Sequence, residues 1–344
     1  MLNNRIIGLC LQLTIVGLGL GGYQAVGNCT SPLSPTKTAS ISSDNAQNFM
    51  KQGLAKYKSG DYKGAIADFD QAIRLNPNDA DAYVNRGNAR DDSGDRQGAI
   101  ADYNQAIRLN PNDASVYYNR GVTRNRLGER QGALEDYNQA IRVDPNYASA
   151  YYNRAITRKR LGDKQGALED YNQALRLNPK NADAYNNRGI VRVALGDKQG
   201  ALADYNQAIS LDPSDASAYY NRGSVRDDLG DKQAALADYN QTLKLDPNYA
   251  AAYVDRGNTR DDLGDNQGAL EDYSQALRLN PSDAYAYYNR AITRNRLGDK
   301  QGAMTDYQKA ATLAEQQGNT SLYQKIQNNL KKLQPSTGTS STAV

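Results

Sequence analysis

The chain of 344 residues contains no histidine, no tryptophan and only two cysteines, and these gaps exclude several classes of function. Without histidine, the commonest general base and the commonest metal ligand are missing. Both cysteines, Cys10 and Cys29, precede the main body of the chain. Disulfides, thiol chemistry and cysteine-based zinc sites are therefore excluded from that body, and we expect neither a cofactor nor a metal.

A large excess of charge of one sign is also lacking. The net charge is +3, and only five of the 41 basic and one of the 38 acidic residues lie outside residues 46–317. The main body is thus nearly neutral, which argues against a polyanion binder, so we expect no nucleic acid partner. Within residues 46–317 glycines occur singly rather than in a phosphate-binding loop, and no pair of carboxylates is set apart for acid–base work. We therefore expect no enzyme activity.

The one long apolar run, Ile6–Leu20, lies near the N-terminus, after Arg5 and before the small residues Ala25–Gly27. This order is typical of a secretory signal. An uncleaved membrane anchor is an alternative, although the run is short for a full span. Residues before Cys29 loosely resemble a bacterial lipoprotein cleavage site, which is a second alternative. A third is that the segment is an apolar tail that is not translocated. For residues 1–29 we expect a signal peptide or an N-terminal membrane anchor, and hence a protein exported to the periplasm or cell envelope, or anchored in the membrane.

Residues 46–317 contain eight copies of a 34-residue unit. Seven copies align on the tyrosines Tyr83, Tyr117, Tyr151, Tyr185, Tyr219, Tyr253 and Tyr287, and a looser first copy starts near Phe49. A repeat of this length is typical of a solenoid, in which each unit buries its apolar face only against its neighbours.

Each unit carries the signals of two helices. In the second copy, Asp79 can cap a first helix, Gly94 ends it and Asp95 caps a second helix, which must stop before Pro111. The second helix has a single apolar stripe, made of Ala99, Tyr103, Ala106 and Ile107. The pattern predicts an antiparallel helical hairpin, with small residues such as Gly87 and Ala99 letting its helices approach closely.

The flanks differ from the repeats. Residues 30–45 are rich in Ser, Thr and Pro and predict a flexible linker. Residues 318–334 carry an apolar stripe that predicts a C-terminal capping helix over the open end of the last repeat. Residues 335–344 are expected to form a disordered tail.

The recurring Tyr83, Gly87, Ala99, Tyr103, Ala106 and Pro111 resemble the tetratricopeptide repeat (TPR) family. The resemblance implies an all-α fold, a right-handed superhelical α-solenoid of helical hairpins whose concave groove binds peptides or protein partners. Two departures concern Arg86 and Arg90, where the family often has Leu and Tyr. These arginines recur in seven repeats, and an acidic residue equivalent to Asp102 recurs in all eight. We expect the two sets to form ion pairs between helices or repeats, worth about 0–1 kcal/mol each if exposed.

By the same resemblance, one face of each first helix lines the groove. It carries a recurring amide: Asn85, Asn119, Asn153, Asn187, Asn221 and Asn289, with Asp255 once. An asparagine offers two donor hydrogens and an acceptor, which suits an extended peptide backbone. The alternative is that these side chains bond within their own repeat.

Beside the asparagines lie tyrosines that could present their rings to a ligand: Tyr118, Tyr152, Tyr220 and Tyr288. The alternative is partial burial between repeats. Short charge runs at the ends of the first helices, acidic at Asp91-Asp92 and basic at Lys159-Arg160, either are solvated surface or add selectivity.

The sequence as a whole predicts a non-catalytic, monomeric scaffold that binds proteins or peptides in its groove. An assembly or chaperone-like factor with transient clients is one alternative. A structural spacer that self-associates through its ends is another.

Overall fold

The computed structural model describes residues 35–333, with side chains from Asp44 onward. Within this range there are 17 helices and no strand. The first helices of the eight hairpins are α1 (Pro35–Lys58), α3 (Ala80–Ser93), α5 (Ala114–Arg126), α7 (Ala148–Arg160), α9 (Ala182–Ala194), α11 (Ala216–Asp228), α13 (Ala250–Asp262) and α15 (Ala284–Arg296). Their partners are α2 (Tyr62–Leu75), α4 (Arg96–Leu109), α6 (Arg130–Val143), α8 (Lys164–Leu177), α10 (Lys198–Leu211), α12 (Lys232–Leu245), α14 (Asn266–Leu279) and α16 (Lys300–Gln316), and α17 (Thr320–Leu333) follows.

The helix boundaries predicted from the second repeat are confirmed. The carboxylate of Asp79 caps α3 by accepting from the backbone N–H groups of Asp81 and Ala82. Gly94 ends α3 in the left-handed region, with φ of 97°. Asp95 caps α4 by accepting from the N–H of Gly98, and α4 ends two residues before Pro111. These local signals recur along the chain and define the hairpins.

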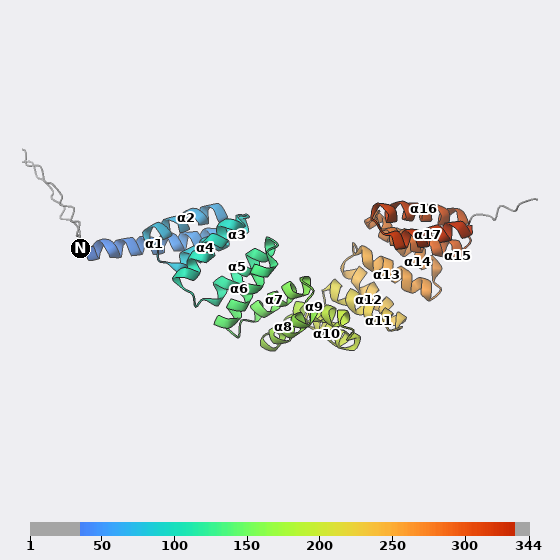
Figure 1. Ribbon diagram of the computed structural model, residues 1–344, viewed down its shortest axis with the longest axis horizontal. Coiled ribbons are helices and arrows are strands. Elements are labelled where there is room, and N and C mark those ends of the chain that lie inside the picture. Colours follow the sequence, from blue (N-terminus) through green and yellow to red (C-terminus); the bar gives the residue numbers. More distant parts are fainter. Residues whose placement is uncertain (1–34, 334–344) are drawn as a thin grey trace, which may run out of the picture.

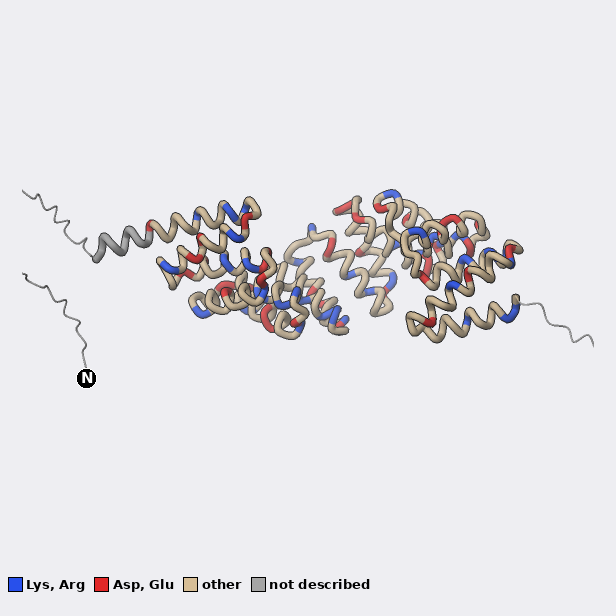
Figure 2. Tube along the Cα trace, turned by 90° about the horizontal axis from the view of Figure 1, so that it is seen from above, with Lys and Arg blue, Asp and Glu red and all other residues tan. Residues whose placement is uncertain are grey.

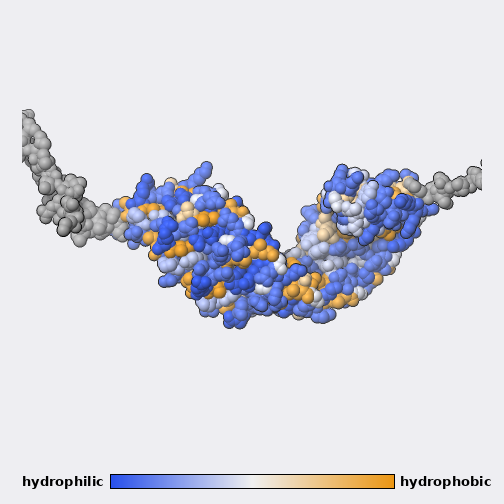
Figure 3. All heavy atoms as spheres, viewed as in Figure 1, coloured by the Kyte–Doolittle hydropathy of each residue, from blue (hydrophilic) through white to orange (hydrophobic). Residues whose placement is uncertain are grey.

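The hairpins stack into an arc, an α-solenoid (Figure 1). Successive odd-numbered helices contact one another along the stack, whereas the even-numbered helices pack mainly against the odd-numbered helices on either side. Helices on the inner side of a curved stack lie closer together, so the odd-numbered helices line the inner surface. The space-filling view shows the wide hollow between the two arms of the arc (Figure 3).

The core of each hairpin depends on one large ring beside small residues. Tyr103 is only 1% exposed and lies against Gly87, where an added Cβ would come within 2.8 Å of its Cε1. Ala99 and Ala106 are fully buried on the same helix as Tyr103. The expected close approach of the two helices through small residues is thus confirmed.

The recurring arginines form a polar layer between hairpins. Arg154 donates from Nε and Nη2 to the carboxylate of Asp170, at 2.9 and 2.6 Å, and from Nη1 to Asn138 of the preceding hairpin, at 2.7 Å. Its guanidinium also lies 5.4 Å from the ring centre of Tyr151. The predicted pairing is confirmed, and the pair is largely buried, because the Asp170 side chain is only 2% exposed and that of Arg154 14%.

The linker expected over residues 30–45 is wrong from Pro35 onward, where α1 begins. Proline is favoured in the first turn of a helix. Between Pro35 and Phe49 there is no glycine and no further proline, so the helix that packs in the first hairpin extends backward without a breaker. A high content of serine and threonine is therefore not enough to distinguish a loop from a helix in this segment.

The helix expected after the last repeat is present as α17. Leu322 and Ile326 are buried against α15 and α16, and Leu330 and Leu333 pack partly buried on the same cluster. The helix therefore covers the open end of the last hairpin.

Residues 1–34 and 334–344 lie outside the described residues, so the signal, anchor, lipoprotein and tail hypotheses stay predictions. Among residues 35–333, no helix is both long enough and apolar enough to span a bilayer.

Candidate functional site: the inner surface of the odd-numbered helices

The predicted asparagines all lie half-buried on the odd-numbered helices. We call the following set the Asn ladder: Asn85 on α3, Asn119 on α5, Asn153 on α7, Asn187 on α9, Asn221 on α11 and Asn289 on α15. Asp255 on α13 takes the same place in the seventh repeat. The odd-numbered helices contact one another in series, so the ladder runs along the inner surface.

Two rungs of the ladder are bonded to the predicted tyrosines. Asn153 donates to the hydroxyl of Tyr118 at 2.9 Å and to the carbonyl of Ser149 at 3.1 Å. Asn187 donates in the same way to Tyr152 at 3.3 Å and to the carbonyl of Asp183 at 3.0 Å. Each of these two amides thus uses both hydrogens within the protein.

Three other rungs bond to asparagines that the sequence analysis did not select. Asn119 donates to Asn88 at 3.2 Å, Asn221 to Asn186 at 2.9 Å and Asn289 to Asn258 at 2.8 Å. For two of these acceptors, Asn88 and Asn258, the sequence contains a signal. Where Val84 and Val254 replace the tyrosine beside the rung, Asn88 and Asn258 supply the acceptor for the next repeat.

The rungs therefore differ in what they can offer a ligand. Asn119, Asn221 and Asn289 each spend one amide hydrogen on the preceding repeat, and Asn85 spends one on the carbonyl of Asp81 at 2.8 Å. Each of these four keeps one donor hydrogen and its carbonyl oxygen for a peptide group. Asn153 keeps only its carbonyl oxygen, and that of Asn187 already accepts from Lys159 at 3.0 Å. The alternative of bonding within the repeat holds only in part, since most rungs also bond across repeats.

The four predicted tyrosines are half-buried between repeats. The ring centre of Tyr118 lies 6.1 Å from that of the buried Tyr137, and Tyr152, Tyr220 and Tyr288 have equivalent neighbours. Their hydroxyls bond to the next repeat or, for Tyr288, to Asn329 of the capping helix at 3.3 Å. These side chains stabilise the stacking of repeats, and contact with a ligand stays a prediction.

Asp255 is the single acid in the ladder series. Its carboxylate accepts from the Tyr220 hydroxyl at 2.8 Å. Burial raises the pKa of Asp255, the Tyr220 hydrogen bond opposes this, and the nearby negative charges of Asp227 and Asp228 raise it further. This rung therefore carries a half-buried carboxyl group with a raised pKa in place of an amide.

Most charge runs at the helix ends are paired across repeats. Arg126 bonds to Asp91, Arg296 to Asp261 at 2.6 Å, and Lys232 to Asp262 at 2.7 Å. Blue and red segments alternate along the chain in Figure 2, without separation into a basic and an acidic face. Most of these charges are therefore balanced by a residue of a neighbouring repeat.

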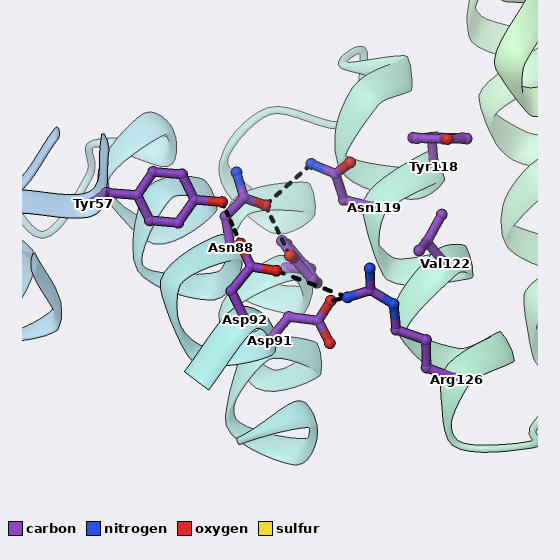
Figure 4. Close-up of a pocket in the computed structure, with 9 residues that line it drawn as sticks. Tyr57, Asn88, Asp91, Asp92, Tyr118, Asn119, Val122 and Arg126 are labelled. Carbon is purple, nitrogen blue, oxygen red and sulfur yellow. Dashed lines mark hydrogen bonds and ion pairs between the residues drawn. The ribbon is translucent and has the colours of Figure 1, made fainter. Parts of the chain in front are cut away.

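A pocket of about 260 Å³ opens between α1, α3 and α5 (Figure 4). Asn88 lies at its centre and accepts from Tyr103 at 2.8 Å and from Asn119 at 3.2 Å. Asp91, Asp92 and Arg126 close one side as an ion-paired group. The equivalent residues, with Asn258 in place of Asn88, line a second pocket five repeats later. The first of these pockets joins the Asn ladder to the charged ends of the helices.

This arrangement, consecutive helical hairpins with a continuous polar inner surface, defines a repeat solenoid. The family model described as TPR repeat matches residues 53–94, 87–128, 123–162, 157–196, 191–230 and 257–298. Models described as tetratricopeptide repeat match residues 216–249 and 284–317. The chain belongs to the tetratricopeptide repeat family, and as such it is a protein-interaction scaffold of a generally non-catalytic kind.

Solved structures support the fold. A tetratricopeptide repeat protein from Parabacteroides merdae is 22% identical with a TM-score of 0.53, over 73% of this chain and 99% of that one. The pilF protein of Pseudomonas aeruginosa is 18% identical with a TM-score of 0.56, over 63% and 97%. A chain of the APC/C hetero-tetramer Cut9–Hcn1 is 18% identical with a TM-score of 0.56, over 79% of this chain and 52% of that one. The comparison with curated proteins found no match.

Proposed function

We propose that the inner surface of the odd-numbered helices binds an extended segment of a partner protein through the Asn ladder. The observation that carries this proposal is the incomplete hydrogen bonding of Asn85, Asn119, Asn221 and Asn289, each of which keeps a donor and an acceptor. One such amide can bond both the carbonyl and the N–H of a peptide group. Because the rungs are spaced by the repeat, a ligand is held at several points, which raises affinity without a deep pocket.

The structure separates the rungs into a test set and a control set. Replacing Asn119, Asn221 and Asn289 together with Ala removes three donor–acceptor pairs, and we expect partner affinity to fall at least about tenfold, since each neutral hydrogen bond contributes about 1 kcal/mol. Replacing Asn153 and Asn187 with Ala removes amides whose hydrogens are already used, and the loss should be much smaller.

The measurement is calorimetric titration with a partner captured from fractionated cells, alongside circular dichroism to check helicity. Equal affinity of the triple variant and the unchanged protein would overturn the ladder proposal. Equal losses in the two sets would show that the rungs act through stacking of the repeats instead.

We further propose that the protein acts in the cell envelope, exported or held at the membrane by residues 1–29. Support comes from the apolar run of that segment alone. Fractionation of cells that produce the full chain, with mass spectrometry of its N-terminus, tests this proposal. An intact N-terminus in the cytoplasmic fraction would contradict it.

A further inference from the structure

Two of the odd-numbered helices begin without the usual cap. In α3, α5, α9, α11 and α15, the side chain of an Asp or Asn accepts a hydrogen bond from the first turn. In α7 and α13 this position is taken by Tyr147 and Tyr249, which make no cap hydrogen bond. Loss of such a cap typically costs about 1 kcal/mol. The chain thus forgoes a cap at two places, three repeats apart, in favour of an aromatic ring.

Each of these rings pairs with a tyrosine of the inner surface. The ring centres of Tyr147 and Tyr118 lie 5.1 Å apart at 69°, and those of Tyr249 and Tyr220 lie 4.8 Å apart at 35°. An aromatic pair is worth about 0.5–1.5 kcal/mol, which can offset the missing cap. Both Tyr147 and Tyr249 remain only half-buried, so part of each ring surface stays open to solvent.

The open part of Tyr147 lines a pocket of about 420 Å³ together with Asp113 and Asp144. Asp113 uses its Oδ1 to accept from the backbone and hydroxyl of Ser115, and Asp144 uses its Oδ1 to accept from the backbone of Asn146. Among the described residues, neither Oδ2 has a hydrogen bond and neither carboxylate has an ion-pair partner. The pocket therefore presents a ring and two carboxylates without a cation.

The second place has the same residue types, although Asp215 Oδ2 there accepts a hydrogen bond from Asn186 at 3.5 Å. Asp215 and Asp246 hold the positions of Asp113 and Asp144 around Tyr249, and they too form no ion pair within residues 44–333. Burial raises the pKa of Tyr249, and the negative charges of Asp215 and Asp246 raise it further. Burial, with Tyr118, Asp113 and Asp144, likewise raises the pKa of Tyr147 to about 12. Both rings are thus neutral at physiological pH and lie in a negative field.

We propose that the groups Tyr147–Asp113–Asp144 and Tyr249–Asp215–Asp246 are two sites for cationic side chains, lysine or arginine, of the polypeptide bound in the groove. A ring face attracts a cation, and carboxylates beside it complete the charge complementarity. This inference rests on the proposed function and specifies its ligand. The partner segment carries two cationic residues, separated by the reach of three repeats.

The chain itself supplies the variant that tests the proposal. Asn181 caps α9, so Tyr147→Asn and Tyr249→Asn together remove both rings, restore two caps and leave the net charge unchanged. We expect thermal stability to be kept or raised, and the affinity for an acetylated tetralysine amide to fall about five- to tenfold. Asn181→Ser is the control, because it changes the cap residue of α9 without removing a ring or altering the net charge, and its affinity should not change.

Calorimetric titration with tetralysine, and with tetraglutamate as the opposite charge, reads out the result. Tetralysine affinity that is unchanged in the double variant, or tetraglutamate binding equal to tetralysine binding, overturns the proposal. Titration with the partner captured from cells distinguishes failure of the cation-site proposal from failure of the groove proposal. If the Asn119, Asn221 and Asn289 variant loses the partner but the double tyrosine variant does not, the groove stands and the cation sites fall.

Discussion

Asp170 accepts two hydrogen bonds from the guanidinium of Arg154, and a second arginine, Arg158, lies 3.0 Å from the same carboxylate. Asp170 belongs to the second helix of its hairpin and both arginines belong to the first. The same group recurs in seven repeats. These repeats are therefore held by ionic contacts at positions where the family often has Leu and Tyr.

Removing this carboxylate should strongly destabilise the protein. Asp170→Ala leaves Arg154 without its counter-charge in a largely buried place, and breaking such a pair costs about 3–5 kcal/mol. Urea unfolding followed by circular dichroism measures the effect. Asp228→Ala is the control, since Asp228 pairs with Lys198 at 3.1 Å where both side chains are more than a third exposed, and it should change stability by less than about 1 kcal/mol. Equal effects of the two changes would contradict the argument from burial.

Two glycines of different conformation should respond in opposite ways to alanine. Gly196 ends its helix with φ of 88°, so Gly196→Ala should cost about 1–2 kcal/mol. Gly132 lies inside α6, and a Cβ there would lie 3.3 Å from Cδ of Arg124; the equivalent Ala234 leaves the equivalent Arg226–Asp238 pair intact at 2.8 Å. Gly132→Ala should therefore stabilise the helix by up to about 1 kcal/mol. Thermal unfolding of both variants checks this, and a loss at Gly132 as large as at Gly196 would count against it.

The protein should lose stability at alkaline pH. Burial raises the pKa of Tyr307 to about 12 from an ordinary value of 10.0, and burial raises that of Tyr171 as well. Above pH 10 the unfolded chain releases these phenolic protons while the folded chain retains them, so unfolding becomes easier as pH rises. The stabilising effect is complete below pH 10 and is lost as pH rises through the folded pKa, by about 1.4 kcal/mol per group and pH unit.

Tyr171→Phe offers a direct check on this behaviour. The Tyr171 hydroxyl is buried without a hydrogen-bond partner, so its removal should cost little at neutral pH. It also removes one titrating group, and the alkaline unfolding midpoint should move to higher pH. Tyrosinate absorbance and circular dichroism, recorded together during the titration, measure the two effects. A midpoint that moves to lower pH would contradict the assignment.

The capping helix should keep the protein monomeric. Removal of residues 319–344 uncovers the apolar surface on which Leu322 and Ile326 lie, and we expect the truncated chain to self-associate with rising concentration. Light scattering after size-exclusion chromatography measures this. Removal of residues 335–344 alone is the control and should leave a monomer. Self-association of the full chain through its ends would favour the structural spacer over the monomeric scaffold.

Much of the fold could be predicted from the sequence, because its signals are local. Asp79, Gly94 and Pro111 act on the backbone within a few residues, so their positions alone mark where helices begin and end. The repeat of these signals every 34 residues predicts the stack of hairpins. The start of α1 at Pro35 was missed because Ser and Thr are permitted in a helix when no breaker interrupts it.

The candidate site could be predicted only in outline. Asn119 and Asn153 occupy equivalent positions in the sequence, yet one bonds to Asn88 and the other to Tyr118. That difference depends on which side chain of the preceding helix reaches the amide, a contact across more than 30 residues.

The amino-acid sequence by itself thus determined the helices, the repeat and the family, since hydrogen bonding and backbone conformation within one hairpin follow from neighbouring residues. Only the tertiary structure decided which groups remain available to a ligand. The stacking of one hairpin on the next takes up an amide hydrogen of Asn153 and leaves Tyr147 beside two carboxylates without a cation. These outcomes depend on distances between repeats, which local sequence patterns do not encode.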